Sequence, residues 1–192
     1  RGYGVCIDDV QITCTFAPAT ISIAASSSQV CLGTSVTFTA TPTNGGTTPA
    51  YQWKVSGSTV SGATNATYSY IPANNDAVTC TLTSNASCVS GNPVTSNTVT
   101  MTVNPFLPVS VSIAPSANPV CSGTSVTFTP SPINGGTPTY QWFKNTVAVS
   151  TGSTYSCFPA NGDQVSVIMT SGLMCKTGSP ATSNIVYMTV PP

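Results

Sequence analysis

The most reactive side chains in this sequence are eight cysteines, in a chain of 192 residues that contains no histidine. Without histidine there is no mixed Cys/His zinc site and no Cys–His nucleophile, and no two cysteines have the CxxC spacing of four-cysteine sites. The chemistry that remains is disulfide formation, which predicts an oxidising compartment. We expect no metal and no cofactor.

The carboxylates offer no second route to catalysis. Asp8 and Asp9 are adjacent, so on an extended strand they face opposite sides, while Asp76 and Asp163 occupy matching positions in two separate repeats. No pair is placed to act as the acid and base of a glycosidase, and the sequence has no GxSxG elbow and no phosphate-binding loop. We predict that the protein is not an enzyme and that Asp76 and Asp163 cap turns.

Charged side chains are few, because four lysines and arginines balance four aspartates. A nucleic-acid-binding surface needs clustered cations that displace counterions, so nucleic acid is excluded as a partner. No apolar run approaches the roughly 20 residues of a membrane helix, and no basic region followed by an apolar stretch opens the chain. We expect no membrane insertion, and we expect that any export signal has been removed.

Much of the sequence occurs twice. Three segments of the first half return in the same order in the second half, which is the signature of an internal repeat. The matching pairs are 29–53 with 119–142, 66–88 with 153–175, and 93–103 with 180–190.

The repeat sets the predicted domain boundaries. We expect a connector strand over residues 1–18, one domain over 19–103, a linker over 104–108 and a second domain over 109–192. The linker reads NPFLP, and two prolines in five residues favour a stiff connection with the domains stacked end to end.

Each repeat reads as a series of short strands. Val126 and Phe128, then Tyr140 and Trp142, lie at alternating positions, as half-buried strands require. Turns rich in Gly, Asn, Ser and Pro separate these runs, and no stretch has a helical period. The sequence therefore predicts an all-β protein with about seven strands per repeat, packed as a sandwich.

Four motifs recur within residues 20–190. They are VCxGTSVTFT, a YQW strand that ends at Trp53 or Trp142, an Asn-x-Asp turn that ends at Asp76 or Asp163, and a closing TSN…MTV segment. With these motifs the chain resembles the tandem immunoglobulin-like and PKD-like repeats of large secreted or cell-surface adhesin and fibre proteins of bacteria. The resemblance implies two seven-stranded immunoglobulin-like sandwiches in a modular stalk, and it implies no catalytic activity.

The cysteines depart from the antibody pattern, in which the disulfide joins mid-strand positions. Cys31 and Cys121 lie 22 and 21 residues before the tryptophan of their repeat, ahead of the strand. The even number of cysteines and the repeat symmetry predict two disulfides, Cys31–Cys88 and Cys121–Cys175, each clamping one end of a sandwich. A bridge over a loop of this length stabilises a domain by about 4 kcal/mol.

Four further cysteines lie outside this symmetry: Cys6, Cys14, Cys80 and Cys157. We interpret them as free thiols or as bonds between subunits. Cys80 occupies an inward position of its strand, which favours a buried thiol that packs as a small hydrophobic side chain.

Residues 4–16 alternate as one more strand, which needs a partner because an isolated strand leaves its backbone groups unpaired. The apolar residues of this connector strand are Val5, Ile7, Val10, Ile12 and Phe16. The stretch IDDVQIT resembles the last strand of bacterial jelly-roll domains. The segment is therefore either the remnant of a preceding domain or a strand donated to a neighbouring subunit.

Cys6 and Cys14 lie roughly 26 Å apart on an extended strand, too far to bond each other. If the strand docks on the next molecule, Cys80 and Cys157 are the thiols there without an assigned partner, and the bonds would make a covalent fibre.

Two kinds of residue could carry or bind sugars. Asn65 and Asn85 fit the glycosylation sequon. Aromatic side chains could stack on sugar rings, although core packing explains most of them. These aromatic residues are Tyr51, Tyr68, Phe106 and Phe143.

Together these features predict a non-enzymatic structural subunit of an extracellular bacterial fibre or adhesin, secreted or held at the cell surface. Its expected partners are copies of itself in a linear homopolymer, and surface glycans. The alternative is a spacer or carbohydrate-binding module of a larger secreted enzyme.

Overall fold

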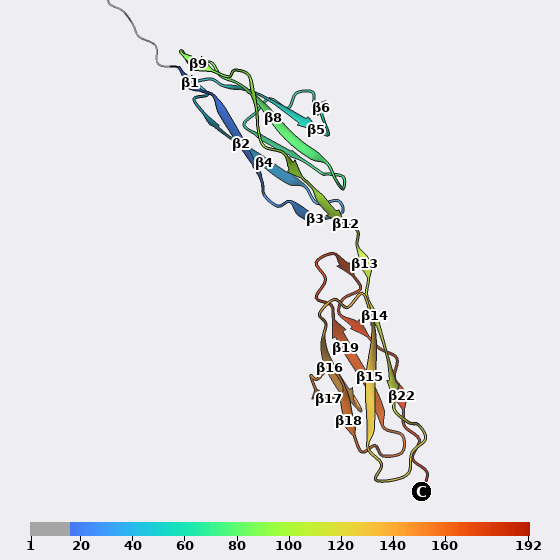
Figure 1. Cartoon of the computed structure of the whole chain (residues 1–192). Coiled ribbons are helices and arrows are strands. Elements are labelled where there is room, and N and C mark those ends of the chain that lie inside the picture. Colours follow the sequence, from blue (N-terminus) through green and yellow to red (C-terminus); the bar gives the residue numbers. More distant parts are fainter. Residues whose placement is uncertain (1–15) are drawn as a thin grey trace, which may run out of the picture. The chain divides into compact units, whose positions relative to one another are not determined.

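The computed structural model describes residues 16–192, which divide at Val103/Asn104 into two compact units. We call them unit 1, which ends at Val103, and unit 2, which begins at Asn104. Every regular element in the described range is a β-strand (Figure 1). Most of the expected connector strand, with Cys6 and Cys14, lies outside the described residues.

Unit 1 has two main sheets, and their strands pair antiparallel. The first sheet consists of β2 (Thr20–Ala25), β4 (Val36–Thr43) and β7 (Thr67–Tyr70). The second sheet consists of β10 (Val94–Thr95), β8 (Ala77–Thr83), β5 (Ala50–Val55) and β6 (Ser58–Thr59), with β11 (Val99–Thr100) also paired to β8. Two short pairs flank them, β1 (Ala17–Pro18) with β9 (Val89–Ser90), and β3 (Gln29–Cys31) with β12 (Thr102–Asn104).

The core of unit 1 lies between its two sheets, because each long strand alternates buried and exposed residues. Phe38 on β4 and Trp53 on β5 are fully buried, and their rings meet across the sandwich with centroids 6.2 Å apart. The indole Nε1 of Trp53 donates to the carbonyl oxygen of Asn65 at 2.9 Å, so the one polar atom of this buried side chain is paired.

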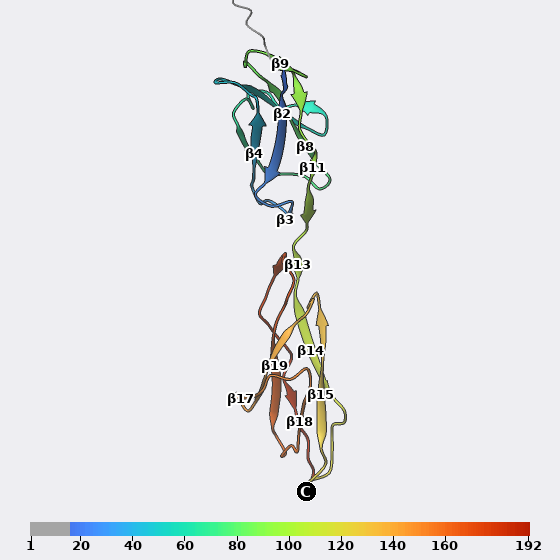
Figure 2. The same cartoon turned by 60° about the vertical axis from the view of Figure 1, so that its left-hand side comes forward.

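Unit 2 repeats the same plan (Figure 2). Its first sheet consists of β14 (Ser110–Pro115), β15 (Val126–Ile133) and β18 (Tyr155–Cys157). Its second sheet consists of β17 (Val147–Ser150), β16 (Thr139–Lys144), β19 (Gln164–Thr170) and β21 (Ala181–Thr182), with β22 (Val186–Tyr187) also paired to β19. A short parallel pair joins β13 (Leu107–Pro108) to β20 (Lys176–Thr177). Trp142 is fully buried in this core and donates to the carbonyl of Gly152 at 2.9 Å.

A three-stranded sheet packed on a sheet of four main strands is the arrangement of an immunoglobulin-like sandwich. The chain therefore has the all-β, tandem immunoglobulin-like fold that the sequence predicts.

The entry to each unit differs from the expected boundary. Ala17–Pro18 pairs in parallel with Val89–Ser90, and Leu107–Pro108 pairs in the same way with Lys176–Thr177. The predicted boundaries place these dipeptides in the connector and in the linker, but both dipeptides belong to the strand pairing of their own unit. Phe16, assigned to the connector strand, immediately precedes the first of these pairs and is exposed.

The Asn-Gly-Gly turn fixes this entry in both repeats. The side-chain amides of Asn44 and Asn134 donate to the carbonyl oxygens of Pro18 and Pro108, at 2.7 and 2.8 Å. The second glycine of the first turn, Gly46, has a φ of +85°, and a Cβ there would lie 2.1 Å from the side-chain oxygen of Asn85. The turn therefore requires glycine at this position.

Candidate functional site: the cysteines and their surroundings

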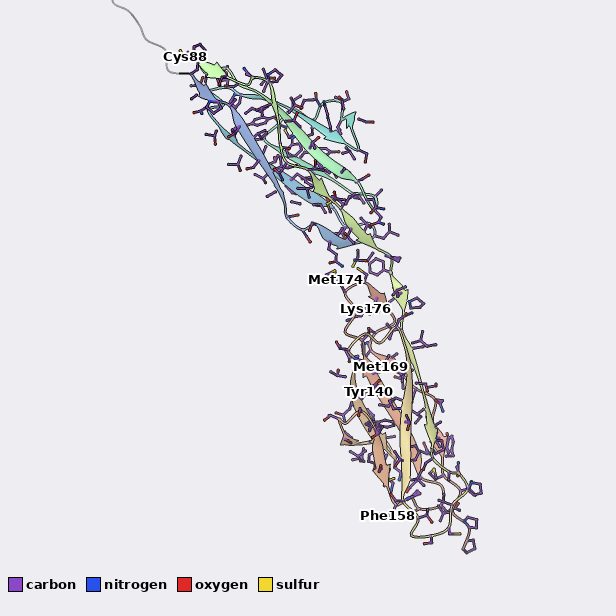
Figure 3. All side chains as sticks on the ribbon, in the orientation of Figure 1. Cys88, Tyr140, Phe158, Met169, Met174 and Lys176 are labelled. Atoms are coloured by element: carbon purple, nitrogen blue, oxygen red, sulfur yellow. The ribbon has the colours of Figure 1, made fainter. Side chains whose placement is uncertain are left out.

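Cys31 and Cys88 are both disulfide-bonded, but they lie at opposite ends of unit 1. Cys31 ends β3, beside β12 at the end of the unit, whereas the carbonyl of Cys88 accepts from the backbone of Ala17 at its start (Figure 3). The eight residues of β4 run between these ends and span about 26 Å. A disulfide needs Cα atoms about 4.4–6.8 Å apart, so the predicted Cys31–Cys88 bond is wrong.

Since Cys80 is a free thiol, the partner of Cys31 is neither of the other cysteines described in unit 1. Cys31 therefore bonds to a cysteine outside residues 16–103, and its disulfide does not close its own sandwich.

The predicted Cys121–Cys175 bond is also wrong. Cys175 is disulfide-bonded, but Cys121 is a free, exposed thiol. The carbonyl of Cys175 accepts from the backbone of Leu107, at the start of unit 2, whereas Cys121 lies near Pro191 and Pro192 at the end of the chain. The same separation of the two ends keeps these cysteines apart.

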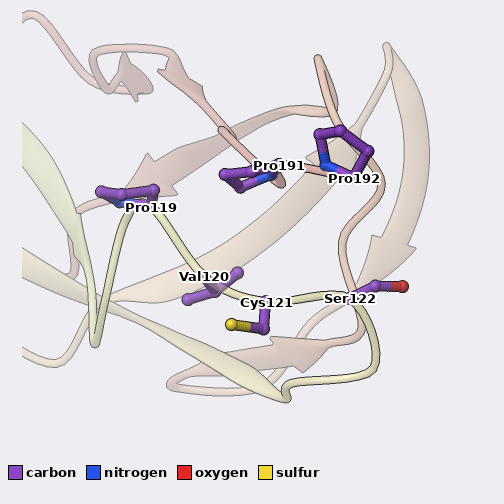
Figure 4. Close-up of a pocket in the computed structure, with 6 residues that line it drawn as sticks. All are labelled: Pro119, Val120, Cys121, Ser122, Pro191 and Pro192. Carbon is purple, nitrogen blue, oxygen red and sulfur yellow. The ribbon is translucent and has the colours of Figure 1, made fainter.

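Cys121 borders a hollow of about 480 Å³ whose other walls are mostly apolar (Figure 4). Pro119, Val120 and Ser122 contribute from its own loop, and Pro191 and Pro192 from the segment that follows β22. Three hydrogen bonds hold this loop to the segment from Tyr187 to Thr189, and the first is donated by the side-chain amide of Asn118 to the carbonyl of Tyr187 at 2.8 Å. The backbone of Val120 donates to the carbonyl of Thr189 at 3.1 Å, and the backbone of Thr189 donates to the side chain of Asn118 at 2.9 Å.

Cys80 is fully buried in the core of unit 1, where burial raises the pKa of its thiol. A buried, protonated thiol cannot meet another molecule, so the interpretation of Cys80 as a bond between subunits is not supported by its position.

Cys157 is half-buried on β18, where unit 1 has Tyr70. Burial, followed by the hydrogen bond with Cys157, raises the pKa of the neighbouring Tyr155 to about 12. The side chain of Cys157 packs against the hydrophobic core of unit 2.

Asp76 and Asp163 cap turns, as predicted. A side-chain oxygen of Asp76 accepts from the backbone of Ala73 at 2.8 Å, and Asp163 accepts from Ala160 at 2.7 Å. Their other partners differ between the repeats. Tyr70 donates its hydroxyl to Asp76 at 3.0 Å.

Asp163 instead forms an ion pair with Lys144, at 2.7 Å, and accepts from the side-chain amide of Asn145 at 2.7 Å. Burial opposes its ionisation, but the hydrogen bonds from Lys144, Ala160 and Asn145 outweigh that effect and lower its pKa. Within residues 16–192 no group of three or more potential ligands is arranged to hold a metal ion.

The TSN motif has a structural role that sequence reasoning did not identify. The side-chain amide of Asn97 accepts from the backbone N–H of Ile23 at 2.8 Å and donates to its carbonyl at 3.1 Å. Asn184 does the same with Ile113, at 2.8 and 3.2 Å. Each amide thus replaces a strand partner and ties the first sheet to the closing segment of the second. Its recurrence at matching positions in both repeats was the available signal.

Of the aromatic residues that could stack on sugar rings, some are packed in the core and others are accessible. Tyr68 is half-buried and packs on Trp53 and Tyr70, with ring centroids 5.8 and 5.1 Å apart, and Tyr51 packs against the same core. These two tyrosines contribute to the core of unit 1, whereas Phe106 is exposed.

Of the two sequon asparagines, Asn85 already uses its side-chain nitrogen to donate to Thr48 at 2.7 Å, so attachment of a glycan there would break this contact. Asn65 is exposed and contributes its backbone carbonyl to the Trp53 contact.

Phe143 lies on the outer face of the second sheet of unit 2. Together with Ile168 and Ile185 it lines a hollow of about 220 Å³. The polar residues around this hollow are Thr146, Gln164, Ser166 and Thr182. The repeat alignment places Lys54, Thr81 and Thr98 of unit 1 at the three apolar positions, so this apolar face belongs to unit 2.

The described residues contain no helix that is long and apolar enough to cross a membrane. No protein-family model matches the sequence. No curated protein matches it either.

Solved structures with a similar backbone include three multidomain proteins. The N-terminal domains of the outer capsid protein Hoc of bacteriophage RB49 align over 90% of this chain and 59% of that chain, with 14% identity and a TM-score of 0.42. Murine CEACAM1b aligns over 89% of this chain and 100% of that chain, with 14% identity and a TM-score of 0.43.

The fibronectin(III)-like modules of Clostridium thermocellum CbhA align over 86% of this chain and 91% of that chain, with 16% identity and a TM-score of 0.38. Such low values carry no functional argument, and the fold assignment rests on the strand pairing described above.

Proposed function

We propose that this protein is a non-enzymatic structural subunit of an extracellular fibre or adhesin, in which the two sandwiches serve as a rod. The disulfide of Cys31 carries this proposal. It is bonded to a cysteine beyond residues 16–103, so it joins its sandwich to another part of the chain and would stiffen a rod. A disulfide within the sandwich would serve stability alone.

The polar groups of the repeats support the same function. Asp76 and Asp163 are used in turns, and Asn97 and Asn184 are used to tie the sheets together. Within residues 16–192 both aspartates and both TSN asparagines are thus committed to holding the fold. Disulfides in a surface with little charge suit a secreted module.

Electron microscopy of the oxidised full chain tests the proposal. We expect linear multimers in a glutathione redox buffer, with a spacing that one subunit sets. Monodisperse monomers over a wide range of protein concentration, in both oxidised and reduced samples, would contradict a fibre subunit.

Carbohydrate binding by unit 2 is the second candidate function. The observation in its favour is the outer hollow around Phe143, where an aromatic ring and two isoleucines lie among hydroxyl and amide groups. A glycan array tests it, with Phe143→Lys as the variant, because lysine occupies the matching position in unit 1. Hits that this variant abolishes would support binding, and an array without hits would remove it.

A further inference from the structure

The outer face of the second sheet of unit 2 has two hollows that adjoin at one residue. Along β19 the residues that alternate with its buried ones point outward, and these are Gln164, Ser166, Ile168 and Thr170. The first three line the hollow of about 220 Å³ around Phe143, and the last two line a second hollow of about 460 Å³. β19 runs from Gln164 to Thr170 and spans about 20 Å. The two hollows, which we call the β19 groove, therefore follow one strand and share Ile168.

We propose that the β19 groove binds an uncharged polysaccharide chain, which lies along β19 and occupies both hollows. This inference rests on carbohydrate binding, the second candidate function, and names its ligand class. A sugar ring has C–H groups on its faces and hydroxyl groups at its edges. It therefore fits a concave site with an apolar floor and a rim of hydrogen-bonding side chains.

The β19 groove has such a floor and such a rim. Its apolar residues are Phe143, Ile168 and Ile185, and Ile168 belongs to both hollows. Hydroxyl and amide side chains surround them. Around the first hollow these are Thr146, Gln164, Ser166 and Thr182, and around the second they are Thr139, Gln141, Thr151 and Thr170. A chain that crosses Ile168 thus meets hydrogen-bonding groups along its whole length.

The charge of the groove selects among polysaccharides. None of the side chains that line the two hollows is an aspartate, glutamate, lysine or arginine. Tyr140 is the one titratable residue among them, and burial raises the pKa of its hydroxyl, so it is neutral. Lys144, a cation of the same strand, is paired with Asp163 at 2.7 Å. An acidic polysaccharide would find no cation to pair with here, so the groove suits an uncharged chain.

The comparison with unit 1 shows that the fold does not need this apolar floor. Unit 1 forms the same sandwich with one lysine and two threonines at the three floor positions, which are Lys54, Thr81 and Thr98. Exposed apolar surface that packing does not require marks a binding surface. The groove therefore belongs to unit 2, and unit 1 supplies the residues for matched substitutions.

Biolayer interferometry on the immobilised full chain tests the ligand class. We expect binding of at least one of three uncharged polymers, dextran, galactomannan and hydroxyethylcellulose, and no binding of the acidic polymer alginate. Ile168→Thr should weaken binding about tenfold, because it removes apolar surface from both hollows. Phe143→Lys should also weaken it, and thermal unfolding checks that both variants are folded. The matched control is Thr81→Ala, at the same strand position of unit 1, which should leave binding unchanged.

The other outcomes separate this inference from the function on which it rests. Binding of alginate and of no uncharged polymer overturns the inference and leaves carbohydrate binding standing. Binding of no polymer removes both. Binding that is unchanged in Ile168→Thr and in Phe143→Lys overturns the β19 groove as the site. Loss of linear multimers in Ile168→Thr, seen by electron microscopy, would assign this face to a contact between copies and also overturn the inference.

A series of chain lengths tests whether both hollows are used. Oligosaccharides of the polymer that binds are titrated into the full chain by isothermal titration calorimetry. We expect a tetrasaccharide to bind at least about tenfold more tightly than the disaccharide, because the longer chain reaches the second hollow. Equal affinities would show that one hollow holds the whole ligand and would overturn a site that extends along β19.

Discussion

The two repeats have the same fold, but only some of their side-chain contacts are the same. The contacts that both units share can be compared with those that only one unit makes. The buried tryptophan, the TSN asparagine and the aspartate turn recur in both units. The differences lie around these elements. Lys144 and Asn145 surround Asp163, where Tyr70 contacts Asp76, and Cys121 is free where Cys31 is bonded.

This comparison separates two kinds of residue. Contacts that recur maintain a sandwich, and positions that differ adapt one sandwich to its place in the chain. The apolar outer face around Phe143 is of the second kind, because unit 1 has polar residues at the same positions. Substitutions of the first kind should therefore have equal effects in the two units, and substitutions of the second kind should not.

The largest equal effect is expected from the tryptophans. Trp53→Ala and Trp142→Ala each remove a fully buried side chain, which costs about 3–5 kcal/mol of unfolding free energy. Hydrogen exchange followed by mass spectrometry assigns the loss to one unit. A cost that differs by more than about 2 kcal/mol between the repeats would show that their cores are not equivalent.

The second-largest loss of unfolding free energy is expected from substitution of the TSN asparagines, Asn97 and Asn184. Asn97→Ala leaves the N–H and carbonyl of Ile23 without their partner, and Asn184→Ala does the same for Ile113, at about 1–3 kcal/mol for each unpaired group. Asn→Asp variants are the control, because they keep the acceptor and lose the donor. We expect their cost to be intermediate in chemical denaturation, and a cost near zero for the alanine variants would remove the proposed tie between sheets.

The alternation of apolar and polar residues in the sequence predicts some features of this structure and not others. The period of two residues identified the strands and the inward position of Cys80, which is fully buried. It could not pair the cysteines, because alternation reports which face a residue occupies and not which end of a sandwich it reaches. Repeat symmetry suggested Cys31–Cys88, but the eight residues of β4 separate them.

The contacts of other recurring residues could not be predicted from the local sequence pattern either. Asn97 acts on Ile23, 74 residues away, and Asn44 acts on Pro18, 26 residues away. Such contacts depend on the packing of one sheet against another. The sequence showed that these asparagines recur, and the structure shows what they contact.

Loss of the Lys144–Asp163 ion pair should destabilise unit 2 and not unit 1, by an amount that depends on pH. Because the pKa of Asp163 is lowered on folding, the stabilisation is present above the ordinary aspartate pKa of about 3.9 and is lost as the pH falls through the lower folded value. Lys144→Met should cost unit 2 about 1 kcal/mol at pH 7. Denaturation at a series of pH values checks this, and a cost that persists unchanged at pH 2 would contradict the ion-pair explanation.

The smallest effect is expected at an exposed pair that both repeats share. The hydroxyls of Thr37 and Ser69 lie 2.8 Å apart, as do those of Thr127 and Ser156. Thr37→Val and Thr127→Val should each change the unfolding free energy by no more than about 0.5 kcal/mol, because the hydroxyls can bond to water instead. A larger loss in either unit, seen in thermal unfolding, would mean that the outer surface of the first sheet contributes to stability.

The state of the repeat cysteines in monomeric protein tests the central claim most directly. Unreduced monomer is alkylated, digested and mapped by mass spectrometry. The structure predicts that Cys121 carries the alkyl label, that Cys31, Cys88 and Cys175 do not, and that no peptide joins Cys31 to Cys88. Peptides that join Cys31 to Cys88 and Cys121 to Cys175 would show that each sandwich closes on itself, and would contradict an outward-bonding repeat.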